Sequence, residues 1–270
     1  MTDVALEGVS YVYRQGSIRA LEGIDLAIRS GERVAIVGQN GSGKTTLARH
    51  LNGLLRPTAG RVIVDGSDAA ERTVAQLARS VGLVFQDPDR QIFSGSVRAE
   101  VAFGPRNVGA RGSDLDERVA TALQMVGLEA AASVNPYDLG YSRRKLLVLA
   151  SVLAMRTPVL VLDEPTTGQD ARGVALVEAV VRSVVAEGRT VIAVSHDMRF
   201  VAETFERVVV MREGRVIIDG PPEDVFAEPQ WPTLASSYLE PTYAATVGAR
   251  LGLGSTPTDE AVVAALLATR

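Results

Sequence analysis

The stretch "RVAIVGQNGSGKTTLARHLNGLL", residues 33–55, decides the fold of this chain. It reads as a buried strand, then a glycine-rich turn, then a segment with the apolar spacing of a helix. The turn matches the pattern G-x-x-x-x-G-K-[ST], in which backbone N–H groups surround the phosphates of a nucleotide. Because the flanking strand and helix stand where this mechanism needs them, we interpret the turn as a phosphate-binding loop.

The residue types in this loop have separate chemical tasks. Glycines let backbone N–H groups turn toward the phosphates, the Lys44 ammonium reaches the β- and γ-phosphate oxygens, and the Thr45 hydroxyl offers a ligand to Mg²⁺. Lys44 is one of two lysines among 28 basic residues, so a lysine here indicates a need for a compact ammonium. The predicted ATP-binding residues of the loop are Gly38, Gln39, Asn40, Gly41, Ser42, Gly43, Lys44, Thr45 and Thr46.

Polar residues at the ends of three further apolar runs predict the rest of a catalytic site. In "VLVLDEP", Asp163 would hold Mg²⁺, and Glu164 would orient or deprotonate the attacking water. Gln86 follows "VGLVF" and offers an amide that can touch both Mg²⁺ and this water, and His196 follows "TVIAVS" and would reach the γ-phosphate. The predicted catalytic residues are Glu164, His196 and Gln86, and the predicted metal ligands are Thr45, Gln86 and Asp163.

The remaining pattern predicts an α/β fold. The runs at 33–38, 80–86, 158–164 and 190–197 are rich in Val, Ile and Leu with helical periodicity between them, which is typical of a parallel sheet flanked by helices. The N-terminal stretch up to residue 32 alternates apolar and polar residues, as antiparallel strands do, and a hairpin is predicted to turn at Glu213-Gly214.

The composition of the chain argues against several classes of function. The chain has no cysteine, which excludes disulfides and thiolate chemistry and fits a reducing compartment. Its net charge of −4 argues against nucleic-acid binding. The apolar runs fall short of the roughly 18 residues of a membrane-spanning helix, and the N-terminus lacks the pattern of a secretory signal. We therefore expect a cytoplasmic protein that acts at a membrane only through a partner.

Taken in order, these motifs resemble an ABC transporter ATPase over about residues 3–225: an aromatic Tyr13, the phosphate loop, Gln86, a short motif before "VLVLDEP", Asp170 in "TTGQD" and His196 in "SHD". The resemblance implies a P-loop NTPase core, an antiparallel β subdomain and a helical subdomain at about 87–157. It implies ATP and Mg²⁺ as cofactors, a D-loop at Asp170, and stacking of the Tyr13 ring on adenine. A core or edge-strand role is the alternative for Tyr13.

The family's LSGGQ signature aligns with an altered turn, residues Leu139, Gly140, Tyr141, Ser142 and Arg143. In the family this motif begins a helix that grips the γ-phosphate bound to the opposite subunit. Here Gly140 lacks the serine hydroxyl and Tyr141 adds a ring where close approach is needed, although Ser142 could restore a hydroxyl or cap the helix. A plain helix cap with a solvated basic face is the alternative. The alteration favours a heterodimer with a second ABC ATPase over a homodimer.

The segment "GLVFQDPDRQIFSGSVRAEVAFGPRNVG", residues 82–109, is similar to the ATPases of energy-coupling factor transporters, the cobalt and vitamin importer group. That likeness implies an integral membrane scaffold subunit and a substrate-binding membrane subunit as partners, with this chain peripheral at the cytoplasmic face. Asp87 and Asp89 would receive arginines from coupling helices of the membrane subunit, or they form an ordinary exposed turn. We predict a nucleotide-binding domain at 1–226 and an extension at 227–270 that packs on the core or pairs the ATPases. An ordinary binding-protein-dependent importer, a soluble ABC ATPase and a nucleotide-binding pseudo-enzyme are the other hypotheses.

Overall fold

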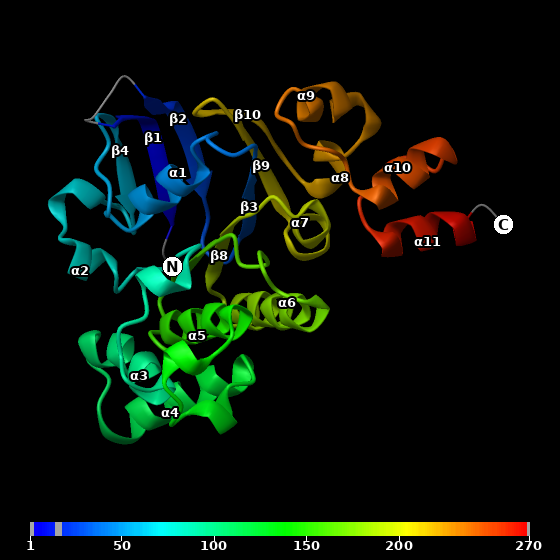
Figure 1. Ribbon diagram of the computed structural model, residues 1–270. Helices are drawn as coiled ribbons and strands as arrows, with labels where there is room; N and C mark the ends of the chain where they lie inside the picture. The colour runs from blue at the N-terminus through cyan, green and yellow to red at the C-terminus, as the bar shows by residue number, and fades with distance from the viewer. Residues whose placement is uncertain (1–2, 14–17, 269–270) are drawn as a thin grey trace.

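The computed structural model describes residues 3–13 and 18–268, and its strands form two sheets (Figure 1). The first sheet is antiparallel with the order β2-β1-β4-β5. Its strands are β1 (Val4–Val12), β2 (Arg19–Ile28), β4 (Ala59–Val64) and β5 (Ser67–Asp68). This sheet confirms the antiparallel N-terminal strands that the alternating pattern predicted.

The second sheet has six strands in the order β10-β9-β3-β8-β7-β6, parallel except for the last hairpin. Its strands are β3 (Arg33–Val37), β6 (Val81–Val84), β7 (Val159–Asp163), β8 (Thr190–Val194), β9 (Arg207–Arg212) and β10 (Arg215–Gly220). The hairpin turns at Glu213 and Gly214, whose φ angles of 50° and 77° suit a two-residue turn with both central residues left-handed. The predicted parallel sheet and hairpin are both present.

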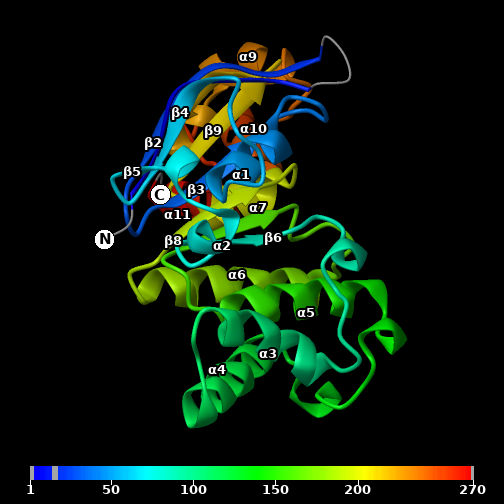
Figure 2. The same ribbon diagram turned by 90° about the vertical axis from the view of Figure 1, so that its left-hand side faces the viewer.

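The six-stranded sheet is apolar throughout because both of its faces are covered. Along β3, Val34 and Ile36 face the core shared with the first sheet, whereas Ala35 and Val37 face the opposite core. Figure 2 shows α1 (Lys44–Leu51) on the side of the first sheet and α6 (Ala171–Ala186) on the other side. The phosphate loop therefore opens at the carboxyl edge of a sheet that is fixed from both faces.

A helical layer lies beyond α6 and forms a subdomain of its own (Figures 1 and 2). It consists of α3 (Val97–Asn107), α4 (Gly112–Met125) and α5 (Tyr141–Leu153). A short helix, α2 (Val74–Leu77), precedes β6, and a 3₁₀ turn, η2 (Pro88–Arg90), leads from β6 toward α3. The fold is thus the predicted P-loop core with an antiparallel β part and a helical part.

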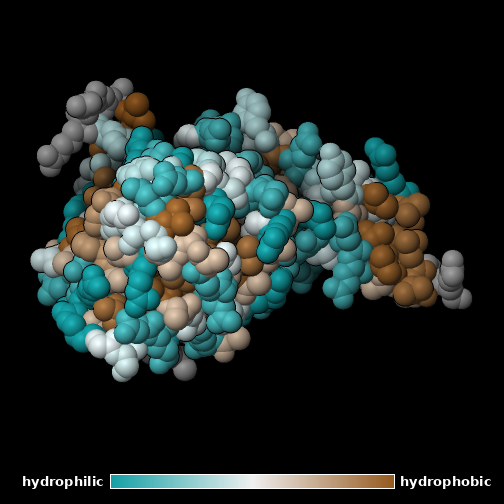
Figure 3. Space-filling model, turned by 60° about the horizontal axis from the view of Figure 1, so that its bottom comes forward, coloured by the Kyte–Doolittle hydropathy of each residue, from teal (hydrophilic) through white to brown (hydrophobic). Residues whose placement is uncertain are grey.

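The first part of the C-terminal segment packs on the core, and its last helix projects from the molecule. After α7 (Met198–Thr204) and the hairpin come α8 (Pro222–Val225), α9 (Trp231–Ala235), α10 (Tyr243–Arg250) and α11 (Asp259–Ala268). Leu234 and Ala245 belong to the main core, and the Trp231 indole N–H donates to the Phe226 carbonyl at 2.9 Å. By contrast, α11 buries no residue, and Figure 3 shows apolar side chains gathered over it at the right-hand end of the molecule. Within the described ranges, no helix has both the length and the apolar character that crossing a membrane requires.

Candidate functional site

The loop between β3 and α1 needs glycine at two places for steric reasons. Gly43 has φ 104°, and a Cβ on it would lie 2.4 Å from the Ala20 carbonyl oxygen. A Cβ on Gly38 would lie 2.3 Å from the Met211 carbonyl oxygen. The backbone of β2 and β9 therefore presses against the loop from outside, which holds the curved path that exposes its N–H groups.

The loop offers hydrogen-bond donors to an anion. Lys44 is buried, and its Nζ donates to the carbonyl oxygens of Gly38 at 2.6 Å and Gln39 at 2.9 Å, so the ammonium lies inside the curve of the loop. Burial lowers the Lys44 pKa, while the carboxylates of Glu164 and Asp163 oppose the shift. The Ser42 hydroxyl is buried without a partner among the described residues. These groups, at the N-terminus of α1, fit the phosphates of a nucleotide.

Oxygen ligands for a hard cation lie beside the loop. The Thr45 hydroxyl donates to Asp163 Oδ1 at 3.1 Å, and Asp163 is 4% exposed at the end of β7. Burial raises the Asp163 pKa, and the Thr45 hydrogen bond opposes this. In the part of the chain that the structure describes, no three His, Cys, Asp or Glu side chains gather into a metal cluster. A hydroxyl and one carboxylate nevertheless suit Mg²⁺, which takes its other ligands from water and phosphate.

Glu164 and His196 meet because β7 and β8 are neighbours in the sheet. His196 Nδ1 lies 2.7 Å from Glu164 Oε2, within hydrogen-bonding distance. Glu164 has the left-handed φ of 53°, and its N–H donates to the Val194 carbonyl at 2.9 Å. The Glu164 side chain is 7% exposed and that of His196 is 60% exposed. A largely buried carboxylate thus lies at the carboxyl edge of the sheet with an accessible imidazole in front of it.

Two cavities join these residues into one site. A cavity of about 340 Å³ is lined by Tyr13, the loop residues from Asn40 to Thr46 except Ser42, and Glu164, while one of about 920 Å³ is lined by Gly38, His196 and residues 238–241. Gln86, Asn40 and Glu164 line both. Gln86 lies two residues beyond the end of β6. Of the residues predicted to bind ATP, bind Mg²⁺ or act in catalysis, all except Ser42 and Asp163 therefore line one of these two cavities.

Tyr13 sits at the rim of the smaller cavity. Its hydroxyl lies 3.0 Å from the Thr46 hydroxyl, and its ring stands edge-on to the Tyr11 ring at a centroid distance of 4.9 Å. Tyr11 in turn stands edge-on to His50, which is buried and bonded to the Thr46 carbonyl. The ring thus belongs to an aromatic row, and its stacking on adenine stays a prediction.

The altered signature turn begins α5, as expected, at Tyr141 after Gly140. The Tyr141 ring lies over the backbone of Gly168, where an added Cβ would come within 2.8 Å of the ring. Of the two roles considered for Ser142, capping the helix is wrong, because Ser142 lies within the first turn and its hydroxyl donates to Gln169 Oε1 at 2.5 Å. The other role, restoring a hydroxyl for the partner's phosphate, stays a prediction. Asp170 caps a different helix, α6, by accepting from the Gly173 N–H at 2.8 Å.

Asp87 and Asp89 are half-exposed and already have partners within the chain. Asp87 accepts from the Asp89 N–H at 3.1 Å and pairs with Arg90 at 3.3 Å. Asp89 pairs with Arg144 of α5 at 3.0 Å. Both roles weighed for these residues therefore remain open: the turn is ordered by its own carboxylates, yet their oxygens face solvent beside α5.

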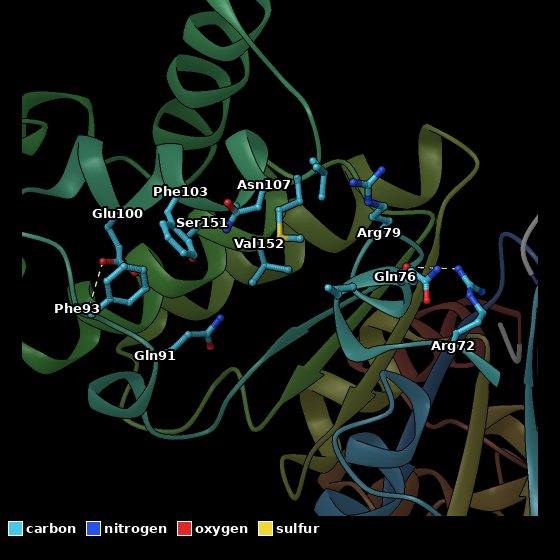
Figure 4. Close-up of a pocket in the computed structure, with 15 residues that line it drawn as sticks. Arg72, Gln76, Arg79, Gln91, Phe93, Glu100, Phe103, Asn107, Ser151 and Val152 are labelled. Carbon is cyan, nitrogen blue, oxygen red and sulfur yellow. Dashed lines mark hydrogen bonds between the residues drawn. The ribbon is translucent and has the colours of Figure 1, made fainter. Parts of the chain in front are cut away.

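An apolar groove follows directly along the chain from this turn, and the sequence did not predict it. It measures about 960 Å³, and Figure 4 shows Phe93 and Phe103 at one end and Arg72 and Arg79 of the α2 region at the other. The two rings meet edge-on at 4.6 Å and are 59% and 47% exposed. Buried Glu100 accepts from the Phe93 N–H at 3.1 Å and fixes the turn that presents this ring. The signal available in the sequence was two phenylalanines in the short segment after the acidic turn, and only the structure shows that both are exposed.

Lys145 is a second residue that the sequence analysis missed. It is buried in α5 and donates to the carbonyl oxygens of Glu164 at 2.5 Å and Thr167 at 3.0 Å. The scarcity of lysine, which drew attention to Lys44, was the signal that could have found it.

The chain has many similar proteins. The family model described as "ABC transporter" matches residues 21–167. The energy-coupling factor transporter ATP-binding protein EcfA1 of Symbiobacterium thermophilum is 47% identical, over 83% of this chain and 81% of that protein. A putative ABC transporter ATP-binding protein of Caldanaerobacter subterraneus is 42% identical over 92% of this chain, which spans only 43% of that longer relative. The solved structure of cbiO1 from Clostridium perfringens, described as part of the ABC transporter complex cbiONQ, superposes with a TM-score of 0.75 at 38% identity over 86% of this chain and 94% of its own.

Proposed function

Because the chain belongs to the ABC transporter family and has the ABC-type ATPase fold, we propose that it is the ATP-hydrolysing motor of an energy-coupling factor type importer for a vitamin or transition-metal ion. One observation carries the proposal. Lys44, Asp163, Glu164 and His196 come from three separate strand ends and converge beside one phosphate loop.

Under this proposal each residue has a separate task in hydrolysis. The loop N–H groups and Lys44 bind the β- and γ-phosphates, which requires the ammonium to exchange the carbonyls of Gly38 and Gln39 for phosphate oxygens. Thr45 and Asp163 would hold Mg²⁺, which would neutralise charge developing on the phosphate oxygens. Glu164 orients the attacking water or accepts its proton, and His196 holds that carboxylate in place from the solvent side.

Pairing with a second ABC ATPase would complete the site. The turn at Leu139–Arg143 would face the nucleotide of the partner, and Arg143, exposed in the first turn of α5, adds positive charge there. The Tyr141 ring is 43% exposed, so it would stand between the turn and a partner's phosphate. This supports a heterodimer in which the partner supplies a better signature to this chain's nucleotide. The exposed apolar side chains of α11 offer a further pairing surface.

The apolar groove supports docking to a membrane subunit. Gln91 and Phe93 line it immediately after the turn that carries Asp87 and Asp89. A partner helix could therefore place apolar side chains between the two phenylalanines and α5 while its arginines meet the acidic turn. Gln86 lies at the other end of this same segment, in the nucleotide site, so docking and nucleotide state would be linked through residues 86–93.

The test is co-purification of the chain with the membrane proteins encoded beside it. Phe93→Ser together with Phe103→Ser should abolish co-purification and leave ATP affinity within about 2-fold, because the groove lies outside the phosphate loop. Leu54→Ser is a matched control, since Leu54 is also an exposed large apolar residue, 42% exposed, but lies away from the groove. Undiminished co-purification of the double variant would reject this docking site. Co-purification of a soluble or lipid-anchored solute receptor would favour an ordinary binding-protein-dependent importer.

A further inference from the structure

Lys145 joins two segments that act on different nucleotides in the proposed dimer. It lies in the second turn of α5, whose N-terminus carries the signature turn. Its ammonium donates to the carbonyls of Glu164 and Thr167, which belong to the loop between β7 and α6. The contact spans 19 residues of sequence and connects the helical subdomain to the catalytic carboxylate's own backbone.

Burying the Lys145 ammonium is unfavourable in free energy, which indicates that the charge has a specific role. Lys145 is 5% exposed, and a buried charge is unfavourable unless it is hydrogen-bonded and paired. Burial lowers its pKa to about 8, although the carboxylates of Glu164 and Asp163 act in the opposite direction. An apolar residue would fill the same space without this cost, but it would leave the two carbonyl oxygens without their donor.

Other contacts bind the same two segments together. The Gln169 side chain accepts from the Ser142 hydroxyl and donates to the Ser142 carbonyl at 3.1 Å, and the Tyr141 ring covers Gly168. The loop from Glu164 to Asp170 is thus attached to the first two turns of α5 at three places.

Glu164 depends on such attachment because its backbone is strained. A non-glycine residue in the left-handed region persists only where its surroundings hold it. The Val194 carbonyl holds the Glu164 N–H, and Lys145 holds the Glu164 carbonyl, so the residue is fixed on both sides.

We propose that Lys145 is a positioning residue that ties the backbone of Glu164 to helix α5, so that the signature turn and the catalytic carboxylate move as one unit. The proposal rests on the ATPase function proposed above. Its consequence is that engagement of the signature turn with the partner's nucleotide is transmitted to the carboxylate that acts on this chain's own nucleotide.

The experiment compares Mg²⁺-ATP hydrolysis by the ATPase complex carrying wild-type chain, Lys145→Met or Leu149→Met. Leu149 lies one turn further along α5 and is equally buried, which makes Leu149→Met a matched control. Lys145→Met should lower kcat by on the order of 10-fold to 100-fold, since sub-ångström misplacement of a reacting group has effects of this size. KM should change by less than about 2-fold, because Lys145 does not line the nucleotide cavities. Leu149→Met should keep kcat within about 2-fold.

Chemical rescue separates positioning from general loss of structure. The chain contains no cysteine, so Lys145→Cys can be alkylated with 2-bromoethylamine in denaturant and refolded, which restores an ammonium of nearly the same length. The identically treated wild-type chain is the control. Rescue of kcat in the alkylated variant would support the proposal.

Amide hydrogen exchange gives a readout that does not need turnover. Amides of residues 166–170 should exchange at least about 10-fold faster in Lys145→Met, while those of α1 should not change. A kcat within 2-fold of wild type together with unchanged exchange would overturn the proposal. Loss of hydrolysis in the wild-type complex would instead reject the proposed function, and the exchange result would still decide the role of Lys145.

Discussion

Replacing Gly43 by alanine should disrupt the phosphate loop far more than the same change at another left-handed glycine. Gly43 has φ 104°, and its new Cβ would lie 2.4 Å from the Ala20 carbonyl oxygen and 3.0 Å from Leu21 Cδ2. Gly66 also has a left-handed φ, 72°, but a Cβ there meets no heavy atom within 4 Å. Gly66→Ala should therefore show backbone strain alone, about 1–2 kcal/mol of unfolding free energy.

Gly43→Ala should lower the unfolding free energy by about 1–3 kcal/mol more than Gly66→Ala does, because the Ala20 backbone is part of β2 and cannot move away easily. Since relief of the clash must displace the loop, ATP affinity should fall at least about 10-fold, whereas Gly66→Ala should keep it. Urea unfolding followed by circular dichroism measures the unfolding free energy, and titration with a fluorescent ATP analogue measures the ATP affinity. Equal unfolding free energies in the two variants, or normal ATP affinity in Gly43→Ala, would refute the reasoning.

Three further predictions concern the site. His196→Ala should lower kcat by on the order of 10²-fold with little change in KM, because it removes the imidazole 2.7 Å from Glu164 Oε2 and leaves, in the described part of the chain, only the longer hydrogen bond from the Thr167 hydroxyl, at 3.4 Å. An unchanged kcat in steady-state assays would contradict this. Burial lowers the pKa of Lys145 from 10.5 to about 8, so between these pH values the unfolded chain binds more protons at Lys145 than the folded chain does. As the pH rises through this range, the unfolding free energy of the wild type should therefore increase relative to that of Lys145→Met, by at most about 1.4 kcal/mol per pH unit. Urea unfolding of both proteins at pH 7 and pH 10 measures this difference in unfolding free energy, and a difference that is no larger at pH 10 would contradict the prediction. Tyr141→Gly should raise the rate of hydrolysis of the nucleotide bound to the partner, because the Tyr141 ring is exposed at the signature turn. The rate is measured in a complex in which Lys44→Ala silences the nucleotide site of this chain. An equal or lower rate would show that the ring does not hinder the signature turn.

The local motifs could be predicted from the sequence because their geometry is set by a few consecutive residues. The phosphate loop needs only a strand, glycines at fixed places and a helix, and all of these lie within residues 33–51. The meeting of Glu164 and His196 was expected for a less local reason. Parallel strands end at one edge, although the sequence does not state that β7 and β8 are neighbours.

The residues that were missed or misjudged depend on packing between distant elements. The Lys145 contact exists only because α5 lies against the loop after β7, and the apolar groove exists only because side chains of α3, α5 and the α2 region line one hollow. Capping its helix was one of two roles that the local pattern allowed for Ser142, but the Ser142 hydroxyl instead donates to a tertiary partner, Gln169. Periodicity and spacing carry no information about such partners.

The most direct test of the ATPase account is a comparison of wild type with Glu164→Gln. Glutamine keeps the shape of the side chain and can still contact His196, but it cannot accept a proton or hold the attacking water as a carboxylate does. The account predicts that Mg²⁺-dependent ATP hydrolysis falls by at least about 10²-fold while ATP remains bound with wild-type affinity or tighter. Hydrolysis by Glu164→Gln at a rate close to that of the wild type would contradict the central claim.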